Sequence, residues 1–396
     1  MSSETRPLHG IRVLDFSRYI AGPYCAALLG YLGADIIRIE KNGGSEDRFV
    51  VPLGGDGGAV FAQSAGNKRS MCLNLKDERS KDIICRLVKA ADVVIVNHPP
   101  AGLRELGLDY DTLKAIKPDI ILTTQTAYGH TGPWADRGGF DGIGQVMSGG
   151  TYFSGQSGQP TKTSVPYVDF GTALYSAFGT LAALYQKRAT GEGQHVQASL
   201  LGTAMSFFSP MLIEQAAVAP DRVGSGNRSQ TSAPSDIFAT TDGHVLLHVV
   251  GNGIFRRLCD VLGRDDWAGD PALDTDEARG VERDRICDAV ATWCASRSSE
   301  EILDAMAAVG VPCGPVLKPA EALQHPQVEA MDFLKAIGMP GMPNGATVAD
   351  FPVAMSGADV GLHRSMPGTG EHSADVLAEI GYNESEIDDL RTAGVI

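Results

Sequence analysis

Residues 10–40 read GIRVLDFSRYIAGPYCAALLGYLGADIIRIE and decide the fold of the first half of the chain. Ile11–Phe16 is a short apolar run rich in β-branched residues, which predicts a buried strand. Tyr24–Leu32 is typical of a helix that ends before Gly33, and Ile36–Ile39 is a second β-branched run. A strand, a helix and a strand joined by a right-handed crossover give two parallel strands.

The alternation of strands and helices continues downstream. Apolar runs predict three further strands, and amphipathic stretches between them predict helices. The predicted strands are Met71–Leu75, Val93–Val96 and Ile120–Thr124, and the predicted helices are Ser80–Ala90 and Asp111–Ile116. This order predicts an α/β fold in which helices cover both faces of an open, Rossmann-like parallel sheet.

The second half of the chain has a different character. Between Ala127 and Pro166, Gly, Ser and Thr dominate and predict long loops, and a helix follows over residues 171–188. Gly224–Pro234 is a polar, glycine-rich linker or ligand loop, and a hairpin with several helices comes after it. We therefore expect a second, smaller α+β domain beyond residue 220.

Composition narrows the classes of partner. The 396 residues, enough for two or three domains, carry 48 acidic and 33 basic side chains, a formal net charge of −15. Because no run of basic residues is present, we expect no nucleic-acid partner and no membrane partner. The sequence shows no signal peptide and no long apolar run, so we expect a cytoplasmic protein. Its seven cysteines form no CxxC pair, which predicts free thiols.

Several common ligand motifs are missing. The sequence has no G-x-G-x-x-G fingerprint after the first strand, no G-x-x-x-x-G-K-[ST] loop and no G-x-S-x-G elbow. Their absence argues against nicotinamide, ATP and α/β-hydrolase chemistry of the usual kinds. His244 and His248 are closely spaced, but on a strand they would lie ~13 Å apart, too far for one metal ion. We expect no metal site.

Asp169 comes directly before the predicted helix over residues 171–188. Its carboxylate has two interpretations: a cap for that helix, or a group held ionised by the helix dipole that serves as a nucleophile. Spacing alone favours the cap. Asp15 and Asp141 are rival candidates, but Asp15 falls inside a predicted strand, where a structural role is expected.

Six cationic residues fall at strand ends or in loops of the first half. Each one alone is most simply a solvated surface charge, but as a set they could neutralise phosphate groups. Lys68 and Arg69, directly before a predicted strand, are the most suggestive pair. The set comprises Arg38, Lys41, Lys68, Arg69, Arg104 and Arg137.

Motifs along nearly the whole chain resemble those of the family III CoA-transferases, the group of formyl-CoA transferase and the carnitine CoA-transferases. The resemblance begins with residues 10–16, 21–23 and 32–40 of the stretch quoted above. It continues through residues 67–70, 91–93, 128–133, 190–194, 310–316 and 370–372.

The resemblance implies a Rossmann-like large domain formed by residues 1–220 and 326–396, a small domain over residues 221–325, and a homodimer of two chains threaded as interlocked rings. It places Asp169 at the family's catalytic aspartate. Coenzyme A is part of the substrate in this family, so no tightly bound cofactor is expected. The resemblance puts these residues in contact with the CoA moiety: Arg38, Lys41, Lys68, Arg69, Asn97 and Arg104.

The family's reaction implies transfer of CoA from an acyl-CoA donor, commonly succinyl-CoA, to a small carboxylic or dicarboxylic acid. It proceeds through an aspartyl anhydride and an aspartyl-CoA thioester. Arg137 or His130 is a candidate to hold a second carboxylate, and Phe140, Gly224 and Gly226 are candidates to contact the substrate.

Two other functions remain as alternatives. The α-methylacyl-CoA racemases share the fold and need a His-Asp pair, but Phe140 stands at the histidine position and cannot exchange a proton. A non-catalytic acyl-CoA-binding protein is the second alternative. Within the transferases, Ile20 stands where formyl-CoA transferase has an active-site glutamine, which argues against formate and oxalate as substrates.

The phosphates of CoA carry several negative charges and must approach a protein whose own net charge is −15. A local concentration of positive charge could overcome this average repulsion. We therefore expect Arg38, Lys41, Lys68, Arg69 and Arg104 to converge on one cleft.

Overall fold

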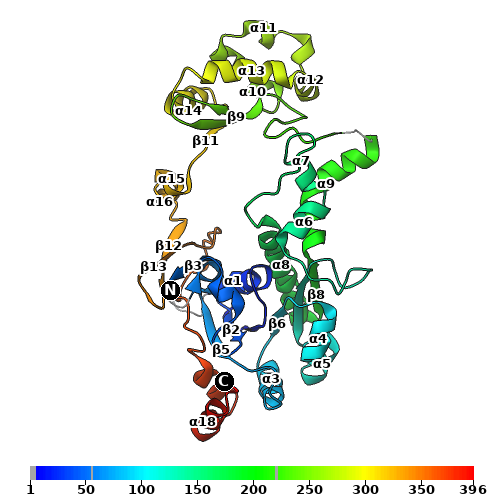
Figure 1. The fold of residues 1–396 in the computed structure, drawn as a ribbon, viewed down its shortest axis with the longest axis vertical. Helices are drawn as coiled ribbons and strands as arrows, with labels where there is room; N and C mark the ends of the chain where they lie inside the picture. Colours follow the sequence, from blue (N-terminus) through cyan, green and yellow to red (C-terminus); the bar gives the residue numbers. More distant parts are fainter. Residues whose placement is uncertain (1–5, 55–56, 219–221) are drawn as a thin grey trace. The chain divides into compact units, whose positions relative to one another are not determined.

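The computed structural model describes residues 6–54, 57–218 and 222–396. The chain divides into two compact units (Figure 1). Each unit has its own hydrophobic core. Among the described helices, none has the length and apolar character needed to cross a membrane. The large unit comprises Met1–Ser148, Ser164–Ala217 and Gln327–Ile396, and the small unit comprises Gly149–Thr163 and Val218–Pro326.

A six-stranded parallel sheet forms the centre of the large unit. Its spatial order is β5-β2-β1-β6-β7-β8, and each neighbouring pair of strands is parallel. This is the order of a doubly wound Rossmann-like sheet, so the predicted α/β class is confirmed. The strands are β1 (Arg12–Asp15), β2 (Asp35–Glu40), β5 (Lys68–Cys72), β6 (Val93–Val96), β7 (Ile121–Thr126) and β8 (His195–Ser199).

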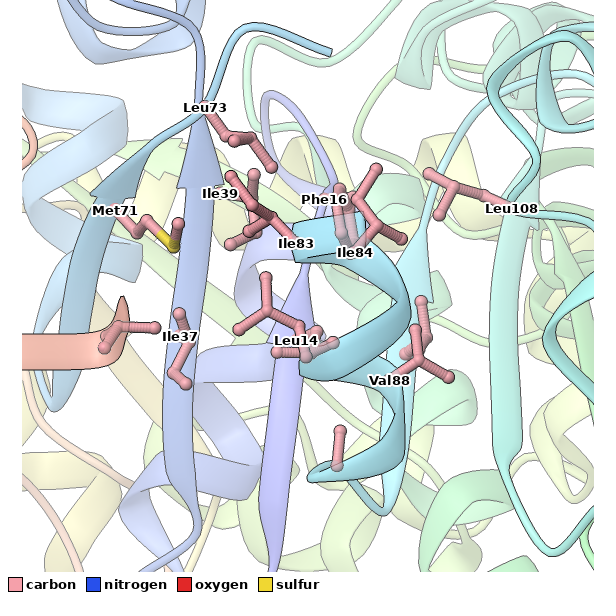
Figure 2. Close-up of a cluster of buried hydrophobic side chains, with 14 of the residues drawn as sticks. Leu14, Phe16, Ile37, Ile39, Met71, Leu73, Ile83, Ile84, Val88 and Leu108 are labelled. Carbon is pink, nitrogen blue, oxygen red and sulfur yellow. The ribbon is translucent and has the colours of Figure 1, made fainter. Parts of the chain in front are cut away.

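Helices cover both faces of this sheet. Because side chains alternate along a strand, Val13 of β1 packs on one face with α1 (Ala21–Tyr31) and α8 (Tyr167–Thr190). Leu14 packs on the other face with α3 (Ser80–Lys89). Figure 2 shows this second cluster, in which the side chains of α3 meet those of the central strands.

The other elements that include residues of the large unit are short, apart from α9. The helices are η2 (Glu46–Phe49), α2 (Ala59–Ala65), α4 (Pro100–Leu106), α5 (Tyr110–Ile116), α6 (Asp141–Met147), α9 (Leu200–Val218), α16 (Pro326–Ala330), α17 (Ser373–Glu379) and α18 (Glu384–Thr392). The strands are β3 (Pro52–Gly54), β4 (Gly57–Gly58), β12 (Leu334–Met339) and β13 (Met342–Ala349), which form two separate hairpins.

The five strands predicted from the sequence all exist, although β5 begins three residues before the predicted start at Met71. The elements that the prediction missed include β8, α9 and the β12–β13 hairpin. Strand β8 lies at the edge of the sheet and has no alternation of buried and exposed side chains. Helix α9 carries Pro210 in its interior, which is a helix-breaking signal in sequence. Helix α8 begins at Tyr167, four residues before the predicted start.

The small unit is an α+β structure. Its antiparallel sheet has the order β11-β10-β9, and helices pack against it around Phe255 and Trp267. His244 and His248 are exposed on one face of β10, as expected of strand residues. The elements are α7 (Gly150–Phe153), β9 (Ser235–Ala239), β10 (His244–His248), α10 (Asn252–Leu262), α11 (Asp265–Ala268), η3 (Pro271–Leu273), α12 (Asp276–Val281), α13 (Arg283–Cys294), α14 (Ser299–Ala308), β11 (Cys313–Pro315) and α15 (Pro319–Ala322).

Candidate active site

A cavity of about 640 Å³ opens in the large unit at the carboxyl ends of β1, β6 and β7. Strand order reverses between β1 and β6, and ligands of doubly wound proteins bind at this switch point. The sequence segments that follow the three strands supply much of the wall. The lining includes residues 18–21, 97–99, 125–127, 137–140, 142–143, Asp169 and Leu200.

The loop after β1 is held in place by Asn97, which follows β6. The Asn97 side chain accepts a hydrogen bond from the Arg18 backbone N–H (2.8 Å) and donates one to the Arg18 carbonyl (2.6 Å). Nη1 of Arg18 donates to the carbonyls of Phe16, Ser17 and Ile39, so one end of the guanidinium is fixed beside the cavity. Two strand ends are thereby joined across the switch point.

Tyr19 has a strained backbone in this loop. Its φ of 66° lies in the left-handed region, which costs a non-glycine residue on the order of 1–3 kcal/mol. Its N–H donates to Asp47, and its ring packs edge-on against Phe140, with ring centroids 5.1 Å apart. Both rings line the cavity, so this strained conformation shapes the wall of the site.

Asp169 lies in the first turn of α8 and is 8% exposed in the cavity wall. It does not cap the helix, so the capping interpretation is wrong. Asp141 performs that role: its Oδ1 accepts hydrogen bonds from the backbone N–H groups of Val168 (2.7 Å) and Asp169 (3.1 Å). The carboxylate of Asp169 is therefore not engaged in capping the N-terminus of α8.

Burial raises the pKa of Asp169 to about 7, and the negative charge of Asp141 contributes to the increase. This pKa differs from the interpretation of Asp169 as a carboxylate that the helix dipole holds ionised. Desolvation outweighs the dipole because the side chain is almost fully enclosed. Near neutral pH, Asp169 therefore exchanges readily between the ionised and protonated forms.

The raised pKa predicts that Asp169→Asn stabilises the fold at alkaline pH. The native carboxyl holds its proton up to about pH 7, whereas an unfolded aspartate loses it near its ordinary value of 3.8. Native stability therefore falls as pH rises between these values, by up to about 4 kcal/mol. Urea unfolding at pH 8 should show the variant to be the more stable protein, and its advantage should shrink by more than half at pH 5. Equal stability of wild type and Asp169→Asn at pH 8 would contradict the conclusion that burying the ionised carboxylate destabilises the fold.

The five cations expected to converge do not line this cavity. The prediction that Arg38 and Lys68 line a shared cleft is wrong, because both side chains are completely buried in ion pairs. Lys68 Nζ lies 2.8 Å from Asp15, and Arg38 Nη2 lies 2.6 Å from Asp47. We call the set to which they belong the buried ion cluster; it comprises Asp15, Arg38, Glu40, Asp47, Arg48 and Lys68.

The other three cations are also separate from the cavity. Arg69 forms ion pairs with Asp35 and Glu379 and is mostly buried. Lys41 is exposed and pairs with Glu46. Arg104 is exposed on α4. Of the positions expected to contact CoA, only Asn97 lies in the cavity wall.

Of the residues predicted to contact the substrate, some line the cavity and others do not. Arg137 and Phe140 line the cavity, and the guanidinium of Arg137 lies 4.3 Å from the ring centroid of Trp134. His130 does not line it; its Nε2 is hydrogen bonded to Thr124 Oγ1 at 2.7 Å. Gly224 and Gly226 belong to the small unit, where the N–H of Gly226 donates to Gly155.

Sequence reasoning missed several residues of the cavity wall, including four with polar or aromatic side chains: Arg18, Tyr19, His98 and Gln125. A signal for them was present, since each lies at or just beyond the carboxyl end of a predicted strand. Among the described residues, no group of three or more His, Cys, Asp or Glu side chains could hold a metal ion.

The fold and this cavity define a doubly wound α/β protein with its ligand site at the switch point of the sheet. Over residues 8–373 the sequence matches CoA-transferase family III, and the chain belongs to this family. The family resemblance drawn from the motifs is thereby confirmed. The protein is an enzyme, and its activity is CoA transfer.

Similar proteins span nearly the full chain. This chain is 33% identical over 392 residues to a succinate-glutarate CoA-transferase of Agrobacterium fabrum, with 96% of this chain and 97% of that protein covered. It is 31% identical over 396 residues to a succinyl-CoA:mesaconate CoA-transferase of Haloarcula hispanica, with 96% and 99% covered. The crystal structure of a CAIB/BAIF family protein from Brucella suis has a TM-score of 0.83 and 31% identity, over 94% of this chain and 99% of that one.

Proposed function

We propose that this enzyme moves CoA from succinyl-CoA to a small dicarboxylic acid and that Asp169 carries the transferred groups covalently. The observation that supports it most strongly is the position of Asp169, a buried carboxylate in the wall of the switch-point cavity. Its backbone N–H is already satisfied by Asp141, and the carboxylate faces a cavity large enough for an acyl group.

In the first half of the reaction, an oxygen of the ionised Asp169 attacks the carbonyl carbon of the donor thioester. The carbon–sulfur bond breaks, CoA leaves as thiolate, and a mixed anhydride remains. The thiolate then attacks the carbonyl carbon of Asp169, and the donor acid leaves as a carboxylate. The product is an aspartyl-CoA thioester.

In the second half, the acceptor carboxylate attacks the same aspartyl carbon and releases CoA thiolate, which leaves a new mixed anhydride. The thiolate attacks the acceptor carbonyl, and the carboxylate of Asp169 is restored. Burial of Asp169 supports this sequence because water would hydrolyse the anhydride. No oxidant, metal ion or additional base is consumed.

Charge in the cavity supports a dicarboxylic substrate. Arg18 and Arg137 both line the wall, and a guanidinium is suited to binding a carboxylate. We assign the second carboxylate of the substrate to Arg137 rather than to His130, which lies outside the cavity. The relatives whose names include succinate, glutarate and mesaconate support the same class of acid.

For CoA itself we propose contacts with Asn97 in the cavity and with the exposed Lys41 and Arg104. Because Arg38 and Lys68 are buried, we propose that they support CoA binding indirectly. Through Asp47, Arg38 is linked to the loop that carries Tyr19, so the buried ion cluster supports the cavity wall.

We also propose that the active form is a homodimer with interlocked chains, as the family resemblance implies. A row of apolar side chains on α8 supports a partner surface: Phe178 is 73% exposed and Tyr185 is 79% exposed, with Leu174 and Tyr175 beside them. Surface patches of this kind usually mark an interface. The seven free cysteines favour a reducing compartment, and we propose the cytoplasm.

The proposal predicts that the wild-type enzyme forms a new acyl-CoA only when donor and acceptor are both present. Succinyl-CoA and acetyl-CoA would each be incubated with glutarate, mesaconate, malate, oxalate and acetate, and the products identified by mass spectrometry. We expect a new CoA ester from succinyl-CoA with one or more dicarboxylates. Exchange of the α-proton of a 2-methylacyl-CoA in deuterated water would instead support a racemase, and binding without turnover would support an acyl-CoA-binding protein.

A further inference from the structure

The side chain of Gln125 is an unpaired amide in the cavity wall. It lies next to the end of β7 and is 2% exposed. Neither its Oε1 nor its Nε2 has a hydrogen-bond partner among the described residues, and the residue lines the switch-point cavity. A buried polar group without a partner destabilises the fold, so its retention in the wall of a site indicates a ligand that completes it.

The surroundings of Gln125 indicate what that ligand offers. Its Oε1 faces the first turn of α1, where a Cβ placed on Gly22 would lie 3.2 Å away. This orientation leaves Nε2 as the available donor. No side chain caps α1, since Ile20 occupies the capping position, and Ala21 in the first turn also lines the cavity. A neutral donor and an uncapped helix start therefore lie side by side, an arrangement that favours a negatively charged oxygen.

The proposed reaction supplies such an oxygen. When Asp169 attacks the thioester, the acyl carbonyl oxygen gains negative charge, and a fixed neutral donor stabilises that charge without reorganisation. Gln125 and Asp169 line the same cavity. We propose that Gln125 donates a hydrogen bond from Nε2 to the acyl carbonyl oxygen during attack by Asp169, and is thus a further catalytic residue. This inference rests on the proposed function.

Substitution by residues of similar size without a donor tests this role. In Gln125→Met and Gln125→Leu, we expect kcat with succinyl-CoA and glutarate to fall roughly 100-fold, because the lost bond forms only in the transition state. The KM of each substrate should change less than threefold. Unfolding in urea should show equal or greater stability, since the substitution removes an unpaired buried amide.

Thr124→Val is the matched control on the same strand. Thr124 is buried, but its Oγ1 bonds to His130 and His195 instead of facing the cavity. This variant should lose stability and keep its kcat. The inference is overturned if Gln125→Met retains kcat within threefold of wild type, or if it loses activity only together with stability. If Asp169→Asn is inactive while Gln125→Met is fully active, only this inference fails; an Asp169→Asn variant with full activity would overturn both proposals.

Discussion

In Asp169→Asn, CoA transfer should fall by about 10⁴-fold or more while the protein stays folded. The amide nitrogen and oxygen cannot form the anhydride, and without the covalent intermediate the acyl and CoA groups have no route between donor and acceptor. Because the carboxylate is buried at a cost to stability, the same variant should be the more stable protein at pH 8. The measurement is initial rates with succinyl-CoA and a dicarboxylate, beside urea unfolding.

Hydroxylamine trapping gives an independent readout of the same prediction. Wild-type enzyme incubated with succinyl-CoA should yield a hydroxamate at Asp169, which peptide mapping by mass spectrometry can locate. Asp111→Asn is a matched control, since this aspartate also lies in the first turn of a helix but is exposed on α5, outside the cavity. It should keep wild-type activity. A hydroxamate at any other carboxylate would contradict the assignment of Asp169.

The second large effect is expected from Lys68→Met, which should lower the free energy of unfolding by about 3–5 kcal/mol. Burial raises the pKa of Asp15, and the charges of Lys68 and Arg38 more than offset this, so the carboxylate remains ionised. Removing Lys68 leaves Asp15 buried with its strongest partner gone, 2.8 Å from where the ammonium stood. Thermal and urea unfolding measure the loss directly.

The control for Lys68→Met is Lys41→Met, which removes an exposed lysine paired with Glu46. Surface pairs contribute about 0–1 kcal/mol, so this variant should unfold almost as wild type does. A double variant, Lys68→Met with Asp15→Asn, should recover part of the stability because it removes the buried carboxylate that has lost its nearest cation. If Lys68→Met were as stable as wild type and only raised the KM for the acyl-CoA, Lys68 would be a substrate contact and the structural role assigned to it would be wrong.

Much of the fold was predictable because it depends on local patterns. β-Branched apolar runs and amphipathic helices alternate through residues 11–124, and this alternation has few solutions other than a parallel sheet with helices on both faces. Two elements that escaped prediction, β8 and α9, have a weak or contrary local signal. Strand β8 pairs with β7 at the edge of the sheet without a buried-and-exposed alternation of its own, and α9 continues through Pro210.

The candidate site was predictable only in part. Asp169 was found through its motif context, but its partner was not, because Asp141 is 28 residues away in sequence and meets it only in the folded chain. The only signal that the sequence gave for Gln125 was its position just beyond a predicted strand. In sequence it is one polar residue at the end of a strand; its lack of a partner becomes visible only when every atom around it is placed.

The sequence by itself therefore determined the class of fold, the family and the candidate catalytic carboxylate of Asp169, since each follows from residue order along the chain. Only the tertiary structure decided which of the predicted cations are exposed and which are buried in ion pairs. Lys41, with its pair to Glu46, remains in solvent, whereas Arg38 and Lys68 are enclosed with carboxylates. Formal charge is a property of the residue, but its availability to a substrate depends on burial and on the nearest opposite charge, and both are set by the packing of distant segments.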